Sequence, residues 1–293
     1  MSPLSRRRVL QAGFAAGALA GVGELPLVAE RGQAHDMVTL GRSKVQVTRL
    51  AFGTGSMGGA VQRALGQQEF TRQVRYAYDR GIRFFETADS YGDMHRMLGV
   101  ALAGLPRDSY QLMSKVTTSD GVSPQAKLDE LRRQVRSEYF DIMLLHWQHT
   151  ADWPEETKAW QEGLSQAKAR KVVRSHGASV HGLPALRQMP GKQWLDVAMI
   201  RVNHNGRRMD AENYATDGPG NVSEVVSHVR QVRAEGMGVV SMKLIGEGVF
   251  NRADRQAAMR FAFRQAGVDS VTVGYKSTAE IDEAIENVQL AFV

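Results

Sequence analysis

Short apolar runs alternate with longer amphipathic segments from about residue 48 to the end of the 293-residue chain. Most of these runs are continuously apolar, which is typical of parallel strands buried on both faces. Between the runs, segments such as residues 123–139 place Leu128, Leu131 and Val135 at helical spacing among charged side chains. We expect strands at Thr48–Phe52, Arg83–Glu86, Gln111–Lys115, Ile142–His146, Val172–His176, Val197–Val202, Gly238–Met242 and Ser270–Val273.

Eight strand–helix units in about 250 residues predict an α/β fold of the (β/α)₈ TIM barrel type, formed as one domain by residues 35–293. Before the first barrel strand, a β-hairpin that turns at Gly41 and Arg42 is expected to plug the bottom of the barrel. The alternative is a doubly wound sheet, which more often carries a G-x-G-x-x-G turn directly after its first strand. The sequence FGTGSMGG does not fit that turn in register, so the barrel is favoured.

The composition narrows the range of partners. The formal net charge is +6, part of which lies in the first 34 residues, and the body of the chain has no basic run, so we expect no nucleic-acid partner. Cysteine is absent, which excludes disulfides, cysteine nucleophiles and cysteine-ligated metal centres. His146 and His149 have no further histidine or acidic pair at comparable spacing, so we expect no metal site.

Residues 1–34 form a segment of different character. The sequence SRRRVL, residues 5–10, resembles the twin-arginine export signal. The uncharged stretch after it, residues 9–23, is too short and too weakly apolar to span a membrane. We expect export by the twin-arginine machinery to the periplasm or outside the cell, cleavage after Ala29 or Ala34, and no stable membrane anchor; a mobile basic tail is the alternative.

Ionisable side chains follow three successive predicted strands. Glu86 ends the second strand and Tyr91 follows it, Lys115 ends the third strand and His146 ends the fourth. Barrel enzymes carry their catalytic residues at this carboxyl end of the strands. An ammonium beside a tyrosine lowers the pKa of the phenol, a carboxylate holds the ammonium, and an imidazole can orient a substrate oxygen. Such a site can protonate a carbonyl oxygen while hydride arrives from a nicotinamide.

These residues resemble the aldo-keto reductases, and the resemblance extends from about residue 38 to the end. The family pattern Asp-Thr-Ala-x-x-Tyr-Gly stands here as ETADSYG, residues 86–92, and SKV and LLHW supply the family's lysine and histidine. The resemblance implies that Tyr91 is the proton donor, that Lys115 tunes it and that His146 orients the carbonyl. Glu86 would replace the family's aspartate and pair with Lys115, with Asp89 as the alternative partner.

The resemblance also implies a nicotinamide cofactor across the last four strands, although two of the three usual polar partners of its carboxamide are replaced. Ser179 is kept, but Val180 stands at the asparagine position and Met199 at the glutamine position. Each lost hydrogen bond costs about 0.5–1.5 kcal/mol. Arg201 or Asn203 could compensate from the same strand as Met199.

The residues expected at the phosphate and adenosine end of the cofactor resemble the family pattern more closely than those at the carboxamide. In SMKLIGEG, residues 241–248, backbone amides can approach a pyrophosphate. The sequence VGYKSTAEIDEAIENV resembles the family's last signature, without its additional arginine, whose place falls near Ile281 or Asp282. The implied cofactor-binding residues are Ser179, Lys243, Gly246, Gly248, Lys276, Ser277, Glu286 and Asn287.

The sequence therefore predicts a monomeric, exported oxidoreductase that reduces a small aldehyde or ketone. Lys276 favours NADPH as the cofactor, with NADH as the alternative. A second hypothesis is an exported nucleotide-binding redox sensor or accessory protein with a vestigial site, which the apolar changes at residues 180 and 199 favour. The intact tyrosine, lysine and histidine favour the enzyme, because a protein that only binds nucleotide has no need of them.

Overall fold

A closed barrel of eight parallel strands forms the centre of the molecule, in the order β10-β3-β4-β5-β6-β7-β8-β9. The computed structural model describes residues 32–118, 121–214 and 219–293. The predicted (β/α)₈ barrel is confirmed. Its strands are β3 (Leu50–Gly53), β4 (Phe84–Glu86), β5 (Gln111–Val116), β6 (Phe140–Gln148), β7 (Val173–Val180), β8 (Val197–Arg201), β9 (Gly238–Met242) and β10 (Ser270–Gly274).

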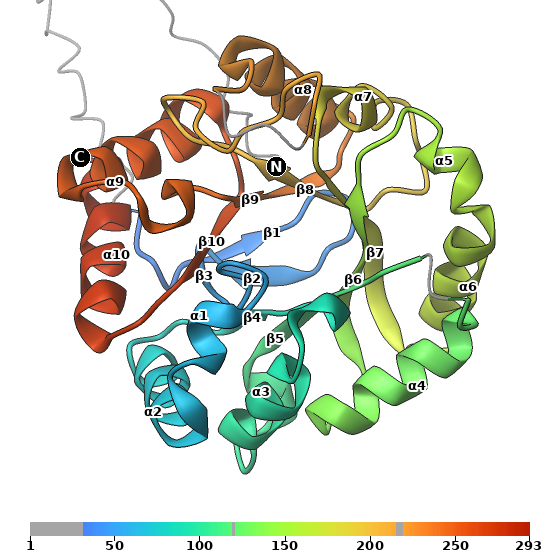
Figure 1. Cartoon of the computed structure of the whole chain (residues 1–293), viewed down its shortest axis with the longest axis horizontal. Coiled ribbons are helices and arrows are strands. Elements are labelled where there is room, and N and C mark those ends of the chain that lie inside the picture. Colours follow the sequence, from blue (N-terminus) through green and yellow to red (C-terminus); the bar gives the residue numbers. More distant parts are fainter. Residues whose placement is uncertain (1–31, 119–120, 215–218) are drawn as a thin grey trace, which may run out of the picture.

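The helices surround the barrel, as Figure 1 shows in a view that looks into it. They are α1 (Ala60–Arg63), α2 (Gly66–Asp79), α3 (Met94–Leu102), α4 (Pro124–Val135), α5 (Trp153–Glu156), α6 (Lys158–Ala169), α7 (Leu183–Leu186), α8 (Val222–Ala234), α9 (Arg252–Arg260) and α10 (Thr278–Ala291). Shorter helical turns are η1 (Asp89–Tyr91), η2 (Arg107–Ser109), η3 (Gly246–Gly248) and the π-helical η4 (Phe261–Ala266).

The predicted hairpin closes one end of the barrel. β1 (Met37–Thr39) and β2 (Gln46–Thr48) pair antiparallel. Leu40, Val45 and Val47 of the hairpin are buried and pack with side chains inside the barrel, among them Phe84 and Met113. The bottom is therefore filled with apolar side chains, and the polar residues of the interior lie toward the opposite end.

Local sequence signals explain where the helices begin and which face they bury. In α4, Pro124 occupies the first turn and the Ser123 hydroxyl accepts a hydrogen bond from the Ala126 N–H at 3.3 Å, which satisfies a backbone donor at the helix start. Leu128, Leu131 and Val135 are buried, as their spacing predicts. The helical periodicity of this segment thus gives the correct core face.

Two strands extend more than one residue beyond their predicted carboxyl ends. β6 runs on to Gln148 and β7 to Val180, and these two residues pair across a register irregularity that begins after Leu145. The added part of β6 contains the polar Gln148 and that of β7 contains Gly177 and Ser179, so neither continues the apolar run. His176, at the carboxyl end of the predicted strand, lies within β7, buried and stacked on Trp194 with ring centroids 4.5 Å apart.

The twin-arginine sequence and the Ala29 cleavage position lie outside the described residues. Within the described ranges, no helix has the length and apolar character needed to cross a membrane.

Candidate active site

A buried ion pair lies at the carboxyl ends of β4 and β5. Lys115 donates to Glu86 Oε1 and to the Thr87 carbonyl, the latter at 2.9 Å, and neither charged side chain is more than 3% exposed. Burial lowers the pKa of Lys115, while the Glu86 carboxylate opposes that shift. Because an unpaired charge would be very costly here, each residue accounts for the burial of the other.

Asp89, the alternative partner of Lys115, is engaged elsewhere. Its two carboxylate oxygens accept hydrogen bonds from the Thr117 N–H at 2.7 Å and from the Thr117 hydroxyl at 2.9 Å. Asp89 therefore ties η1 to the end of β5. The pairing of Lys115 with Glu86 is the one that the sequence favours.

Tyr91 ends the turn η1 and lies against the ion pair. Its ring centroid is 4.8 Å from Lys115 Nζ, and its carbonyl accepts a hydrogen bond from Arg63 at 2.5 Å. On the other side the ring lies so close to Gly55 that a Cβ there would be 2.6 Å from the phenol oxygen. Position 55 therefore requires glycine, and the tyrosine ring is held between this backbone and Lys115.

The protonation of Tyr91 differs from the prediction. Burial, reinforced by the negative charges of Glu86 and Glu247, raises the pKa of Tyr91 well above its usual value. The net shift is opposite to the direction expected from the Lys115 ammonium alone, because burial of the phenol is the largest cause and the nearby carboxylates add to it. Tyr91 is therefore a protonated phenol, the form that a proton donor needs.

His146, near the end of β6, lies edge-to-face against Tyr91 with ring centroids 5.5 Å apart. Its Nδ1 is 3.0 Å from the Ser90 hydroxyl. Burial and the positive charge of Lys115 hold the pKa of His146 well below its usual value. A neutral imidazole, oriented by Ser90, is thus placed beside the phenol.

Further rings surround His146 at the mouth of the barrel. His181, just after β7, lies 6.4 Å from it between ring centroids, and its pKa is also held well below its usual value by burial. Trp147, His149 and Tyr214 form an adjoining cluster, in which the rings of His149 and Tyr214 are 4.2 Å apart. His181 therefore adds a second imidazole beside His146.

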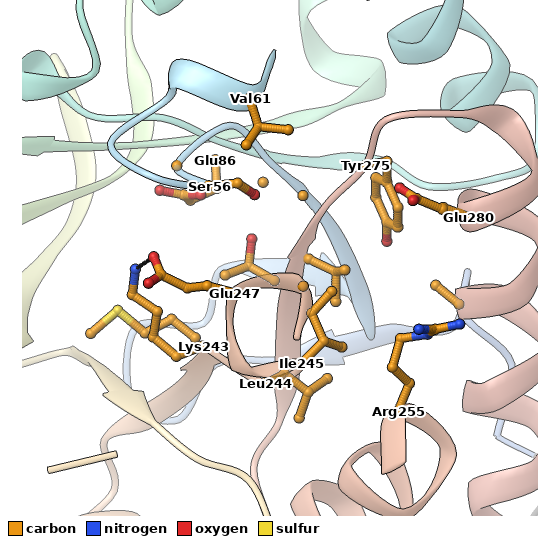
Figure 2. A pocket seen from close by; sticks show the side chains of 18 of the residues that line it. Ser56, Val61, Glu86, Lys243, Leu244, Ile245, Glu247, Arg255, Tyr275 and Glu280 are labelled. Atoms are coloured by element: carbon orange, nitrogen blue, oxygen red, sulfur yellow. Dashed lines mark hydrogen bonds and ion pairs between the residues drawn. The ribbon is translucent and has the colours of Figure 1, made fainter. Parts of the chain in front are cut away.

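A groove of about 240 Å³ runs from Tyr91 and Glu86 along the ends of β9 and β10 to the helices α9 and α10 (Figure 2). Its walls include Gly53, Gly55, Ser56, Met199, Met242, Lys243, Leu244, Ile245, Glu247, Gly248, Arg255, Met259, Thr272, Val273, Gly274, Tyr275, Lys276, Glu280, Glu283, Ala284 and Asn287. The predicted phenol and four of the predicted cofactor residues therefore line one continuous space: Lys243, Gly248, Lys276 and Asn287. Gly246, another predicted cofactor residue, is not part of this lining.

The loop after β9 has the conformation expected of a phosphate-binding turn but carries a carboxylate. Gly246 and Gly248 have φ of 58° and 91°, and a Cβ on Gly248 would meet no atom within 4 Å. Between them, Glu247 has φ 58° and forms ion pairs with Lys243 and, at 3.4 Å, with Arg208. Lys243, one of the predicted cofactor residues, is thus already paired in the groove (Figure 2).

The residues predicted at the α10 end divide into two groups. Lys276 and Asn287 line the groove. Ser277 instead caps α10, where its hydroxyl accepts from the Glu280 N–H at 3.3 Å. Glu286 is exposed and pairs with Arg252 at 2.9 Å outside the groove lining, and Glu283 lines the groove in its place.

The carboxamide region contains few free polar groups. Met199 lines the groove, whereas Ser179 is buried with its hydroxyl 3.9 Å from the Met242 sulfur, and Val180 is fully buried. Arg201 donates to Asp210 at 2.7 Å, and the Asn203 amide donates to backbone carbonyls. The two proposed compensating side chains are therefore already used within the protein.

Several residues that line the groove belong to no motif recognised in the sequence. The Thr272 hydroxyl and the Tyr275 hydroxyl line the groove, are buried, and have no hydrogen-bond partner among the residues described. Arg255 enters from α9, a helix that carries no recognised motif. Unsatisfied buried hydroxyls beside a glycine-containing loop with one lysine fit a polar, phosphorylated ligand such as a dinucleotide.

The barrel, the strand-end phenol with its lysine and imidazole, and the adjoining groove form the arrangement expected of a TIM-barrel oxidoreductase. Residues 49–257 match the Aldo/keto reductase family. Since this match spans more than half of the sequence, the chain belongs to the aldo/keto reductase family of enzymes.

Individual relatives are distant. The protein named "Probable aldo-keto reductase 1" of Glycine max is 30% identical over 176 residues, which cover 51% of this chain and 49% of the relative. The match thus spans about half the length of that relative. An aldo-keto reductase of Mycolicibacterium smegmatis is 27% identical over 180 residues, 56% of this chain and 62% of the relative.

Solved structures show the same fold. A Pseudomonas aeruginosa protein described as an aldo-keto reductase superposes with a TM-score of 0.70 at 22% identity, covering 89% of this chain and 98% of that one. A Klebsiella pneumoniae aldo-keto reductase in complex with NADPH gives a TM-score of 0.63 at 17% identity, covering 87% of this chain and 89% of that one.

Metal ligands do not gather at this site. In the parts of the chain that the structure describes, no group of three or more histidine, aspartate or glutamate side chains is arranged to hold a metal ion.

The contribution of the Glu86–Lys115 ion pair can be tested by measuring the free energy of unfolding. Replacing Glu86 by Gln leaves the buried Lys115 ammonium without its counter-charge, so we expect the free energy of unfolding to fall by about 3–5 kcal/mol in urea denaturation. The double variant E86Q/K115M should recover much of that loss. The control Glu286→Gln breaks an exposed pair and should cost no more than about 1 kcal/mol. An E86Q variant as stable as the unmodified protein would show that Lys115 is uncharged when folded.

Proposed function

We propose that the protein reduces an aldehyde or ketone to an alcohol, with NADPH as the hydride source. The observation that carries this proposal is the position of the Tyr91 phenol, which lies beside a buried Glu86–Lys115 pair and lines the groove that reaches α10. A bound reduced nicotinamide would supply hydride to the carbonyl carbon. The substrate is a small carbonyl compound, and we propose that the protein acts as a monomer.

The chain's own residues account for the proton. As the carbonyl oxygen gains negative charge, Tyr91 Oη donates its proton to that oxygen and becomes a phenolate. The Lys115 ammonium, 4.8 Å from the ring centroid, stabilises the phenolate as it forms. The neutral His146 imidazole, held by Ser90, can donate one N–H to the same carbonyl oxygen and orient it.

The groove provides contacts for the rest of the nucleotide. Lys243 and the backbone amides around Gly248 would hold the pyrophosphate, and Thr272 and Tyr275 offer hydroxyls that have no described partner. The NADPH complex of the Klebsiella pneumoniae relative supports NADPH as the cofactor, with NADH as the alternative. Apolar Val180 and Met199 weaken the hold on the carboxamide by about 0.5–1.5 kcal/mol for each lost hydrogen bond.

The rival function, a nucleotide-binding sensor with a vestigial site, has less support. It accounts for the apolar carboxamide region but gives no reason for a buried ion pair against a tyrosine. Membership of an enzyme family likewise favours turnover.

The proton-donor role predicts the effect of Tyr91→Phe. The variant lacks the donated proton but keeps the ring, so turnover of an aldehyde panel should fall by about 10²–10⁴-fold while nucleotide affinity changes little. Tyr78→Phe is the matched control, because it removes a phenol hydroxyl that donates to Ser109 outside the groove lining, and it should retain turnover. If Y91F turns over as fast as the unmodified protein, Tyr91 is not the donor.

The negative charge of Glu247 in the loop after β9 predicts that its removal strengthens the binding of NADPH. Glu247 competes with an anionic pyrophosphate for Lys243, so Glu247→Gln should lower the Kd for NADPH several-fold, followed by quenching of tryptophan fluorescence. The control Glu286→Gln removes a carboxylate outside the groove and should leave the Kd unchanged. Weaker binding by E247Q would mean that the carboxylate helps to hold the nucleotide.

We also propose that residues near the N-terminus direct export through the twin-arginine machinery to the periplasm or the exterior. The sequence of residues 5–10 supports this assignment. Of the two cleavage positions, we favour Ala29, because Ala34 is buried and its carbonyl accepts a hydrogen bond from the Leu50 N–H at 3.1 Å.

Replacing Arg6 and Arg7 by lysines should leave the precursor in the cytoplasm, since the pathway distinguishes arginine from lysine at these positions. Immunoblots of cell fractions measure this directly, with Arg31→Lys as the control that should be exported normally. Export of the double-lysine variant at the normal rate would refute the assignment.

A further inference from the structure

The end of the groove opposite the catalytic tyrosine should receive the adenosine half of the cofactor, if the proposed function holds. Hydride transfer requires the nicotinamide beside Tyr91, so the remainder of the dinucleotide extends toward α9 and α10. NADPH differs from NADH there by one phosphate on the ribose. A protein that selects NADPH needs a cation at that place.

The helix α10 does not supply such a cation from its own turns. At the positions where a family arginine would fall, Ile281 is fully buried and Asp282 accepts hydrogen bonds from the Tyr76 hydroxyl at 2.9 and 2.8 Å. Asp282 also pairs with Arg80 at 3.3 Å, so it is turned toward α2. Lys276, before the helix, is a lysine with a side chain 65% exposed and only 4.0 Å from Glu280.

Arg255 enters the same region from α9. Figure 2 shows it projecting into the groove on the side of Tyr275 and Glu280. Its Nε and Nη2 donate to the two carboxylate oxygens of Glu283 at 2.6 and 2.9 Å, and its Nη1 donates to the Phe250 carbonyl at 2.6 Å. These three contacts fix the plane of the guanidinium.

A fixed guanidinium still has donors to offer. Arginine carries five N–H groups, and the structure gives partners for three of them, which leaves two directed away from Glu283. A pre-oriented guanidinium edge is suited to the oxygens of a phosphate group. Glu283 acts as a positioning residue, because it holds one edge of the guanidinium while the other edge stays available.

We propose that Arg255 is the residue that recognises the ribose 2′-phosphate of NADPH, with its guanidinium delivered from α9 in place of an arginine on α10. This inference rests on the proposed function and makes it more specific. Lys276 adds a second, more mobile charge at the rim. The pairing with Glu283 makes the recognition depend on geometry as well as on net charge.

The test compares Arg255→Gln with the unmodified protein, using NADPH and NADH as probes and tryptophan fluorescence as the readout. We expect the Kd for NADPH to rise by about tenfold to a hundredfold and the Kd for NADH to stay nearly constant. Adenosine 2′,5′-bisphosphate and adenosine 5′-monophosphate, as competitors, should show the same contrast without the nicotinamide half. Arg252→Gln is the matched control, since Arg252 lies on the same helix but pairs with Glu286 outside the groove lining.

The outcomes distinguish a failure of the proposed function from a failure of the inference about Arg255 alone. If the unmodified protein binds neither nucleotide, the proposed function fails and this inference fails with it. If it binds both equally, or if Arg255→Gln weakens both alike or neither, only the inference is overturned. Should Arg255→Gln not fold, Arg255→Lys keeps the charge without the planar fork; a selective loss of NADPH affinity supports the proposal, and unchanged affinities overturn it.

Discussion

The buried Glu86–Lys115 pair is the constraint around which the active end of the barrel is arranged. An ammonium that is fully enclosed by protein must have a carboxylate beside it, and Glu86 reaches it from the neighbouring strand. With that charge satisfied, Asp89 is available to fasten the turn η1 to Thr117 at the end of β5. The turn in turn places Tyr91 between Lys115 and the bare backbone of Gly55. One ion pair therefore determines both the charge at the site and the position of the phenol.

The same pairing of opposite charges continues along the groove. Each cation among its lining residues has a carboxylate partner that also lines it, in the pairs Lys243–Glu247, Arg255–Glu283 and Lys276–Glu280. An anionic dinucleotide thus enters a groove whose positive charges are already balanced, so it must share or displace these carboxylates. This makes the net electrostatic gain smaller than a count of lysines and arginines would indicate. Selectivity then depends on which donors remain correctly oriented after the internal pairs are satisfied.

Much of the fold and half of the site could be predicted from the sequence, for identifiable reasons. Buried parallel strands are short apolar runs, and successive strands of a barrel bring their carboxyl ends together, so Glu86, Lys115 and His146 had to converge. The end of the groove at α9 and α10 was less predictable. Its lining depends on which faces of these helices turn toward the groove and on the conformation of the loop after β9. Helical spacing could have placed Glu280, Glu283 and Asn287 on one face of α10, since they are three and four residues apart. Nothing in the sequence indicated that Arg255 would project from α9 into the same space.

The pKa of Tyr91 is set by burial and by all the charged groups around the phenol, and not by Lys115 alone. A lysine next to a phenol favours the phenolate, but at Tyr91 burial and the negative charge of Glu86 shift the pKa in the other direction. Burial then dominates and keeps the proton on the oxygen. That state is suited to reduction, because the proton is retained until negative charge develops on the substrate oxygen beside it. The nearby ammonium reduces the cost of forming the phenolate during proton transfer to the substrate, while burial opposes loss of the proton to solvent.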